Sequence, residues 1–281
     1  MILIADSGST KCHWVLCDQK EIILKCVTIG FNPFFIDSSK ILSNLKKSEL
    51  KKYKNEIRTV FFYGAGCSMK SKNKIIENAF SKFFLKADIN IDHDINAACY
   101  AMCDNNESIN CILGTGSNIA YYDGKKILEN KPSIGYLIGD EASGNYFGKK
   151  ILNLYFNKQL DKKLELEFKS TYELDWPHVM NKLYKKERVN VYLASFFPFI
   201  YKNKKHKVIK KIINKGLNDF FTLHILPYKN YKNISINFIG SVAYFLEYEI
   251  REIAKKYNCK INYIEQHPID RLVDFHLKNL K

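Results

Sequence analysis

The stretch Asp6-Ser7-Gly8-Ser9-Thr10-Lys11 decides the fold; it is a short polar turn between two apolar runs, 2–5 and 12–17. The flanking runs are typical of β-strands, so the turn joins one strand to the next. Glycine lets the backbone approach a phosphate closely, and the amides and hydroxyls of such a turn can hold phosphate oxygens. The stretch predicts a phosphate-handling turn, although by itself it also fits an ordinary hairpin.

A second turn of the same character, Leu113-Gly114-Thr115-Gly116-Ser117-Asn118, follows the apolar run 110–113. The runs 119–122 and 126–128 flank Asp123-Gly124 and predict a hairpin. The chain therefore starts twice with a strand, a glycine-rich turn and a return strand, and this internal repeat organises the sequence. Two such turns predict a clamp for a polyphosphate between two domains.

The remaining pattern alternates strands and helices. In the first half we expect a third strand at 21–27, helices at 38–53, 73–84 and 94–103, and strands at 59–63 and 89–91. In the second half we expect a mostly helical stretch over about 141–225, a strand at 234–239, a helix from Gly240 to about 257, a strand at 260–264 and a helix at 269–280. A nucleotide can dock at the start of a helix such as the one that Gly240 begins. The predicted domains are 1–110, with the helix 268–281 packing back on it, and 111–267.

Composition limits the class of protein. The 281 residues are 46% hydrophobic, and no apolar run reaches the roughly 18 residues of a membrane span. With no signal peptide evident at the N-terminus, we expect a cytoplasmic protein. The eight cysteines form no Cys-x-x-Cys pair, so we expect reduced thiols and no metal site built from them.

The net charge of +15 raises the question of nucleic-acid binding. The lysines are spread over many segments, often as pairs, and no nucleic-acid-binding motif accompanies them. We therefore expect no nucleic-acid partner. Nucleotides are anions as well, so the basic charge fits a protein that binds ATP.

Seven segments in order along the chain resemble the actin-like ATPase fold shared by sugar kinases and actin. Within that superfamily they resemble the N-acetylglucosamine kinase branch, grouped with the BadF/BadG/BcrA/BcrD-type ATPases. The segments are 6–11, 30–33, 63–67, 94–98, 113–118, 135–144 and 238–241, of which 135–144 is the most specific. The resemblance implies an α/β, two-domain, ribonuclease H-like fold with the active site in the interdomain cleft.

The resemblance also implies an activity, namely phosphorylation of N-acetylglucosamine or a related amino sugar at the 6-hydroxyl, with ATP and Mg²⁺. Asp94 stands at the position of the catalytic base. Asp6, a carboxylate at the end of a strand, can hold Mg²⁺ through water. From the residues alone, Asp94 could instead cap a helix, and Asp92 is a rival carboxylate. We favour Asp94 because Ala97 and Ala98 follow it as in the family.

The other candidate residues carry over position by position. Those for the sugar are Asn32, Gly64, Ala65, Gly66, Gly135, Tyr136, Asp140 and Glu141. Those for ATP are Ser9, Thr10, Lys11, Thr115, Gly116, Ser117, Asn118, Ala194, Gly240 and Ser241. Their structural alternatives are a turn residue for Asn32, helix capping for Asp140 and Glu141, and helix core for Ala194.

Two other functions fit the same fold. One is an ATPase that activates an electron-transfer partner, as in dimeric dehydratase activators that bridge an iron–sulfur cluster through cysteines; the block 139–144 contains no cysteine. The other is a non-catalytic sugar or nucleotide sensor, against which the presence of both Asp6 and Asp94 argues. A small-molecule sugar is the expected partner, no membrane is expected, and a homodimer is left open.

Overall fold

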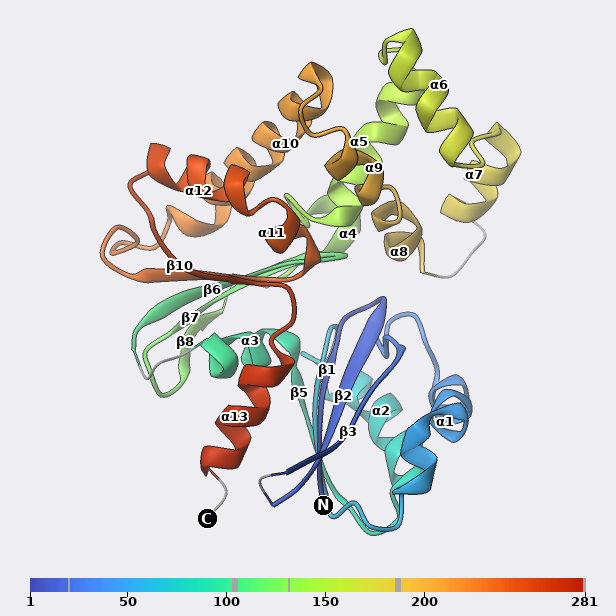
Figure 1. The fold of residues 1–281 in the computed structure, drawn as a ribbon, viewed down its shortest axis with the longest axis vertical. Coiled ribbons are helices and arrows are strands. Elements are labelled where there is room, and N and C mark those ends of the chain that lie inside the picture. The colour runs from blue at the N-terminus through green and yellow to red at the C-terminus, as the bar shows by residue number, and fades with distance from the viewer. Residues whose placement is uncertain (20, 103–105, 131, 185–187, 280–281) are drawn as a thin grey trace. The chain divides into compact units, whose positions relative to one another are not determined.

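The structure is a computed structural model that describes residues 1–281 except 20, 103–105, 131, 185–187 and 280–281, and leaves out the side chains of 128–130. The chain divides into two compact units. Unit 1 comprises 1–106, 122–128 and 267–281, and unit 2 comprises 107–121 and 129–266. Two five-stranded sheets, each accompanied by helices, confirm the predicted α/β class (Figure 1).

The first sheet has the strand order β3-β2-β1-β4-β5. Its strands are β1 (Ile2–Ser7), β2 (Lys11–Asp18), β3 (Glu21–Ile29), β4 (Thr59–Gly64) and β5 (Asp88–His93). The first three strands form an antiparallel meander, β4 pairs with β1 in parallel, and β5 pairs with β4 in parallel. The register places Ser7 beside Gly64 and Gly64 beside His93, so the carboxyl ends of three parallel strands meet at one edge.

Alternation along the strands divides this sheet into two buried faces. Leu3, Trp14 and Phe62 lie on one face, and they pack with residues of α1 (Ser38–Lys47) and α2 (Lys70–Phe83). Four aromatic rings, those of Trp14, Phe31, Phe62 and Phe80, contact one another in this core. The two helices that cover this face follow β3 and β4 directly in the sequence, so neighbouring parts of the chain form this side of unit 1.

The opposite face is covered by helices from both ends of the unit. Ile4, Val15 and Tyr63 pack with α3 (Asp94–Met102) and with Ile269, Leu272 and Val273 of α13 (Ile269–Asn279). Figure 1 shows α13 beside α3 and the first sheet. The predicted helix at the end of the chain therefore packs on the first sheet, and its expected last residue lies outside the described residues.

His276 of α13 is buried inside unit 1. Its Nε2 atom lies 3.0 Å from the Tyr63 hydroxyl, and its ring stacks on Phe61 with centroids 4.0 Å apart. Burial lowers the pKa of His276 to about 4. The imidazole is therefore neutral in the folded chain over the whole range in which a free histidine would gain a proton.

This histidine makes stability depend on pH. Between pH 6.5 and 4 the unfolded chain binds the proton and the folded chain does not, so stability falls as the pH falls. The shift corresponds to about 3 kcal/mol lost between pH 7 and pH 4. We expect the unfolding free energy of wild type, measured in urea relative to that of His276→Phe, which keeps a ring against Phe61, to fall by this amount between pH 7 and pH 4. Parallel pH curves for the two proteins would contradict the assignment.

The second sheet has the order β10-β9-β6-β7-β8, and β6, β9 and β10 run parallel. Its strands are β6 (Ser108–Leu113), β7 (Ser117–Tyr122), β8 (Ile127–Asn130), β9 (Ser235–Ile239) and β10 (Lys260–Glu265). The buried Asn237 amide donates to Asn110 Oδ1 at 2.9 Å, and Asn110 donates to Ser108 Oγ at 3.0 Å. A shift in register would break these buried hydrogen bonds, so they fix the pairing of β6 with β9.

Helices make up most of the rest of unit 2. They are α4 (Gly135–Ile138), α5 (Gly144–Phe156), α6 (Lys162–Thr171), α7 (Trp176–Tyr184), α8 (Val189–Ala194), α9 (Phe197–Lys202), α10 (Lys207–Phe220), the π-helix η2 (Phe221–Ile225), α11 (Ser241–Phe245) and α12 (Glu247–Lys256). The predicted helical stretch over about 141–225 is confirmed. Among the described helices, none has the length and apolar character needed to cross a membrane.

Two predicted helices are shorter than expected. The helix expected over 38–53 ends at Lys47, because Ser48 is extended and returns both its N–H and its hydroxyl to Leu45 O; a 3₁₀ turn (Glu49–Lys52) follows. The helix expected from Gly240 to about 257 is two helices, α11 and α12, with a break at Leu246. In both places a local backbone break interrupts a continuous helical pattern.

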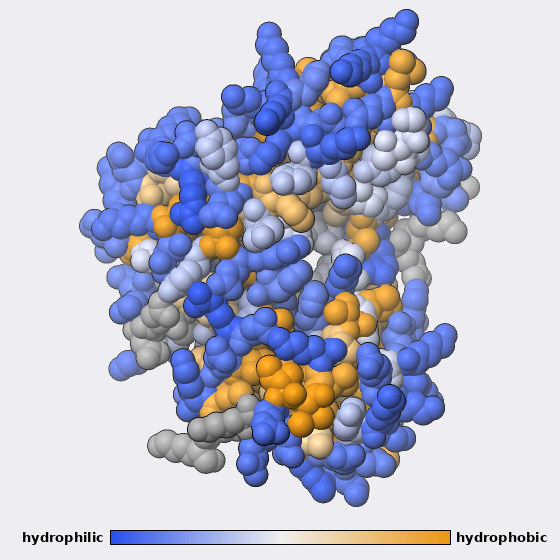
Figure 2. Space-filling view, viewed as in Figure 1, coloured by the Kyte–Doolittle hydropathy of each residue, from blue (hydrophilic) through white to orange (hydrophobic). Residues whose placement is uncertain are grey.

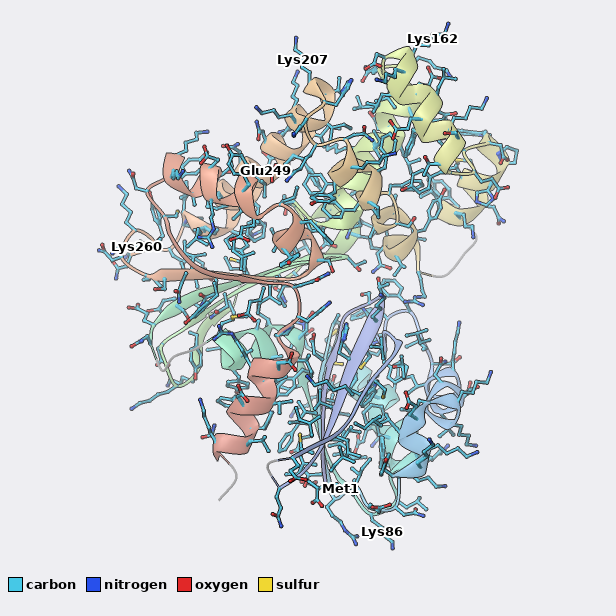
Figure 3. The ribbon with its side chains drawn as sticks, in the orientation of Figure 1. Met1, Lys86, Lys162, Lys207, Glu249 and Lys260 are labelled. Atoms are coloured by element: carbon cyan, nitrogen blue, oxygen red, sulfur yellow. The ribbon has the colours of Figure 1, made fainter. Side chains whose placement is uncertain are left out.

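The surface carries its positive charge on separate segments. Figure 3 labels Lys86, Lys162, Lys207 and Lys260, which are exposed and come from four different parts of the chain. Figure 2 shows a largely hydrophilic face with an apolar area over unit 1. Ile22, Ile23 and Val27 of β3 are exposed apolar side chains of this unit. The seven described cysteines, 12, 17, 26, 67, 99, 111 and 259, are free thiols, and Cys103 lies outside the described residues.

Candidate active site

Two carboxylates lie at the carboxyl edge of the first sheet. Asp6 belongs to the end of β1, and Asp94 is the first residue of α3, directly after β5. Burial, and then the negative charge of Asp94, raise the pKa of Asp6 to about 7. The two carboxylates are therefore close enough to interact, although they lie almost ninety residues apart in sequence.

Asp92 and Asp94 have different surroundings. Asp92 Oδ1 accepts hydrogen bonds from His93 N at 2.8 Å and from Asn96 Nδ2 at 2.7 Å, which ties it to the first turn of α3. Asp94 has 17% of its side chain exposed, and its Oδ1 lies 3.3 Å from His93 Nε2. Asp92 is thus held by hydrogen bonds from residues on either side of Asp94, whereas Asp94 interacts with His93 and Asp6.

Asn32 is tied to the first glycine-rich turn. Its side chain is only 8% exposed; Nδ2 donates to Ser9 Oγ at 2.8 Å, and Oδ1 accepts from Phe34 N at 3.0 Å. Gly30 N donates to Thr10 O at 2.9 Å, which brings the 30–34 loop against the same turn. The structural alternative for Asn32, a turn-forming residue, is present in the fold, and a contact with sugar stays a prediction.

The segment after β4 completes this group. Ala65 N donates to Ser7 O at 2.8 Å, and Gly66 has a φ of +83°. A Cβ atom on Gly66 would lie 2.5 Å from Asn32 Oδ1, so only glycine fits there without a shift. Ser7, the 64–66 segment and Asn32 are therefore packed together at the edge that carries Asp6.

A buried thiol also lies at this edge. Burial, and then the charges of Asp94 and Asp92, raise the pKa of Cys67 to about 12. Its Sγ atom would lie 2.8 Å from a Cβ on Gly64, so the thiol fills the space beside that glycine. The thiol stays protonated at neutral pH and acts as a small apolar group.

Unit 2 forms its own group around the second glycine-rich turn. Gly114 N donates to Gly116 O at 2.9 Å, and Asp140 Oδ1 accepts from Ser117 N at 3.2 Å. A Cβ on Gly116 would lie 2.8 Å from Asp140 Oδ2, so the missing side chain makes room for the carboxylate. Burial raises the pKa of Asp140, and the hydrogen bonds from Asn145 and Ser117 oppose that shift.

Three helix ends meet this turn. Gly144 N at the start of α5 donates to Gly114 O at 2.8 Å, and a Cβ on Gly144 would lie 3.0 Å from Ala194 Cβ at the end of α8. Gly240, before α11, has a φ of +113°, and its Cβ would lie 2.4 Å from Leu113 O. Gly240 thus lies against the Leu113–Gly114 segment, and Ala194 lies against Gly144 beside it. Their contact with ATP stays a prediction.

Capping at the start of α5 falls to Ser143. Its Oγ accepts from Tyr146 N at 3.2 Å, so neither Asp140 nor Glu141 is the N-cap residue. Glu141 instead faces His224 of the π-helix, with Oε2 and Nε2 2.9 Å apart. Sequence reasoning missed His224, because nothing in its helical surroundings marks it.

The remaining candidates take more open positions. Tyr136 lies on α4, its carbonyl accepts a hydrogen bond from Lys149 Nζ, and it lines a cavity of about 440 Å³. Thr10 and Lys11 are exposed. Gly135, Tyr136, Ser117, Asn118 and Ser241 are among the candidates that are partly exposed.

The candidate residues thus form two groups, one in each unit. Unit 1 holds Asp6, Ser9, Thr10, Lys11, Asn32, Gly64, Ala65, Gly66 and Asp94. Unit 2 holds Thr115, Gly116, Ser117, Asn118, Gly135, Tyr136, Asp140, Glu141, Ala194, Gly240 and Ser241. Each group combines a glycine-rich turn with carboxylates, the chemistry of a site that handles phosphates and hydroxyls.

Comparison with known proteins finds full-length structural relatives. A Porphyromonas gingivalis structure titled "Putative N-acetylglucosamine Kinase" is 32% identical, with a TM-score of 0.91 and 99% of each chain covered. One from Chromobacterium violaceum with the same designation is 13% identical, with a TM-score of 0.69 and 98% of each chain covered. A ROK family glucokinase from Streptomyces griseus, in complex with glucose and AMPPNP, is 12% identical, with a TM-score of 0.58 and 97% and 98% covered. No protein-family profile matches the sequence, and no match is found among curated proteins.

The two sheets and their relatives define the class as the actin-like ATPase fold of the sugar kinases, as the sequence predicted. Identity of 32% along the whole chain is more specific than a shared fold. The chain belongs to the N-acetylglucosamine kinase family.

Proposed function

We propose that this protein is an ATP-dependent kinase that phosphorylates N-acetylglucosamine or a related amino sugar, at the 6-hydroxyl. The observation that carries the proposal is the Asp6–Asp94 pair, because the two carboxylates interact at one edge of the first sheet. The Asp92 carboxylate instead accepts hydrogen bonds from His93 N and Asn96 Nδ2. The similarity to the Porphyromonas gingivalis protein supports an amino sugar as the acceptor.

In this proposal Asp94 is the general base. Phosphoryl transfer needs an acceptor hydroxyl held in line with the γ-phosphate, and a carboxylate that orients this hydroxyl and takes its proton. Asn32, the 64–66 segment, Gly135, Tyr136, Asp140 and Glu141 would contact the sugar. A carboxylate such as Asp140 can accept hydrogen bonds from two neighbouring sugar hydroxyls.

The two glycine-rich turns would bind ATP, each through backbone amides and hydroxyls. In unit 1 this falls to Ser9, Thr10 and Lys11. In unit 2 it falls to 115–118, with Ala194 at the adenine and Gly240 and Ser241 at the start of α11. Lys11 would add positive charge near the phosphates.

The residues present fit a magnesium ion. Asp6 and Asp94 offer hard oxygen ligands, and the pKa of about 7 for Asp6 means that its charged form lacks a compensating positive charge. Asp6 would hold Mg²⁺ through water. When bound, the ion would neutralise charge on the transferred phosphoryl group.

A sugar panel tests this function. With MgATP, we expect ADP release only when an acceptor sugar is present, and a preference for N-acetylglucosamine or another amino sugar over glucose. Phosphorus NMR of the product should place the phosphate on the 6-oxygen. Equal ADP release with and without every sugar would refute the proposal.

A further inference from the structure

Asn145, near the start of α5, joins two of the candidate segments of unit 2. Its side chain is fully buried. The Nδ2 atom donates to Asp140 Oδ2 at 2.6 Å and to Thr115 O at 2.7 Å, and the backbone N–H donates to the same carbonyl at 3.1 Å. One residue therefore holds both a candidate sugar ligand and the turn of the candidate phosphate site.

The orientation of this amide is fixed by its partners. Both partners of Nδ2 are acceptors only, so a flipped amide would place its oxygen against a carboxylate and a carbonyl. Oδ1 is buried and has no hydrogen-bond partner among the described residues. A buried acceptor without a partner costs folding free energy, so stability alone does not explain an asparagine here.

The hydrogen bonds close a ring. Asp140 accepts a hydrogen bond from Ser117 N on one oxygen and from Asn145 Nδ2 on the other. Asn145 Nδ2 also donates to the carbonyl of Thr115, two residues before Ser117. Asp140 itself has a φ of +61°, in the left-handed region that aspartate and asparagine adopt more readily than other non-glycine residues. The hydrogen bonds thus hold the Asp140 carboxylate in one position beside the turn.

We propose that Asn145 is a positioning residue that couples sugar binding to nucleotide binding, an inference that rests on the proposed function. A phosphate bound to the 114–118 turn fixes the positions of Thr115 and Ser117. Through Asn145 it also fixes the Asp140 carboxylate, which accepts hydrogen bonds from the sugar hydroxyls. By thermodynamic reciprocity, a sugar bound to Asp140 orders the turn for the nucleotide by the same factor.

Binding measurements on the full chain test the coupling. The probe is N-acetylglucosamine, titrated by calorimetry with and without saturating AMPPNP and Mg²⁺. We expect AMPPNP to lower the sugar Kd of wild type at least about fivefold. In Asn145→Ala the ratio should fall to within about twofold of one. Asn214→Ala, an exposed asparagine on α10, is the matched control and should keep the wild-type ratio.

An isosteric variant gives a second, pH-dependent readout. In Asn145→Asp the new carboxyl group faces Asp140 and can donate a hydrogen bond only when protonated. We expect its KM for the sugar to rise at least about tenfold between pH 5.5 and 8, while the wild-type KM changes less than threefold. A merely structural role for the side chain would not produce this pH dependence.

The outcomes distinguish failure of the coupling by Asn145 from failure of the proposed kinase function. A wild-type ratio near one, an unchanged ratio in Asn145→Ala, or parallel pH profiles for Asn145→Asp and wild type would overturn the inference. Absence of sugar-dependent ADP release in wild type would overturn the proposed function instead. Melting temperatures of the three variants within about 4 °C of wild type would show that the changes in ratio are not due to unfolding.

Discussion

Replacement of Asp94 by asparagine is expected to lower kcat about 10²–10⁴-fold, the usual contribution of a general base. The amide keeps the shape of the side chain and its hydrogen-bonding reach but cannot accept the proton of the sugar hydroxyl. Sugar and AMPPNP should therefore bind with Kd values within about threefold of wild type. Steady-state kinetics and calorimetry on the same preparation measure both quantities.

Asp92→Asn is the matched control, the same chemical change two residues away. Its Oδ1 can still accept from His93 N and Asn96 Nδ2, so α3 should keep its start and kcat should stay within about threefold. If Asp92→Asn lost turnover and Asp94→Asn kept it, the base would be Asp92.

Gly30→Ala is expected to lower stability strongly. A Cβ at this position would lie 2.0 Å from Gly8 O and 2.6 Å from the carbonyl carbon of Ser9, and both are backbone atoms that no side-chain rotation can move. The 30–34 loop and the first glycine-rich turn must separate, which also breaks the bond from Gly30 N to Thr10 O. We expect about 3–5 kcal/mol of lost stability by urea unfolding, and a nucleotide Kd raised at least tenfold.

Gly8→Ala provides the control inside the same turn. Its nearest neighbour for a new Cβ is Lys11 O at 3.7 Å, an ordinary van der Waals distance. The unfolding free energy should change by less than about 1 kcal/mol. Equal losses in the two variants would show that close packing at Gly30 is not what holds the turn.

The repeated strand–turn–strand units could be predicted because their determinants are local. Asp6–Lys11 and Leu113–Asn118 carry turn residues between apolar strands, and the structure places both where expected. The helix breaks at Ser48 and Leu246 could not, since both sit inside continuous helical patterns. At Ser48 the break depends on hydrogen bonds to Leu45 that compete with the helix.

The sequence predicts which residue types the candidate site contains, but not which of these residues contact one another. The choice between Asp92 and Asp94 depends on which oxygen reaches the start of α3, which only coordinates reveal. Asn145 and His224 carry no motif of their own; they matter through partners that are 30 and 83 residues distant in sequence. Sequence spacing within a helix gives no information on such long-range partners.

The packing of α13 on the first sheet has a consequence for synthesis. A ribosome releases β1, β2 and β4 early, but the partners of Ile4, Val15 and Tyr63 at 269–273 emerge only after residues 107–266. At about 5–20 residues per second this delay is on the order of 10–30 seconds. During that time only α3 covers this sheet face, and the apolar area that α13 buries stays exposed on the nascent chain.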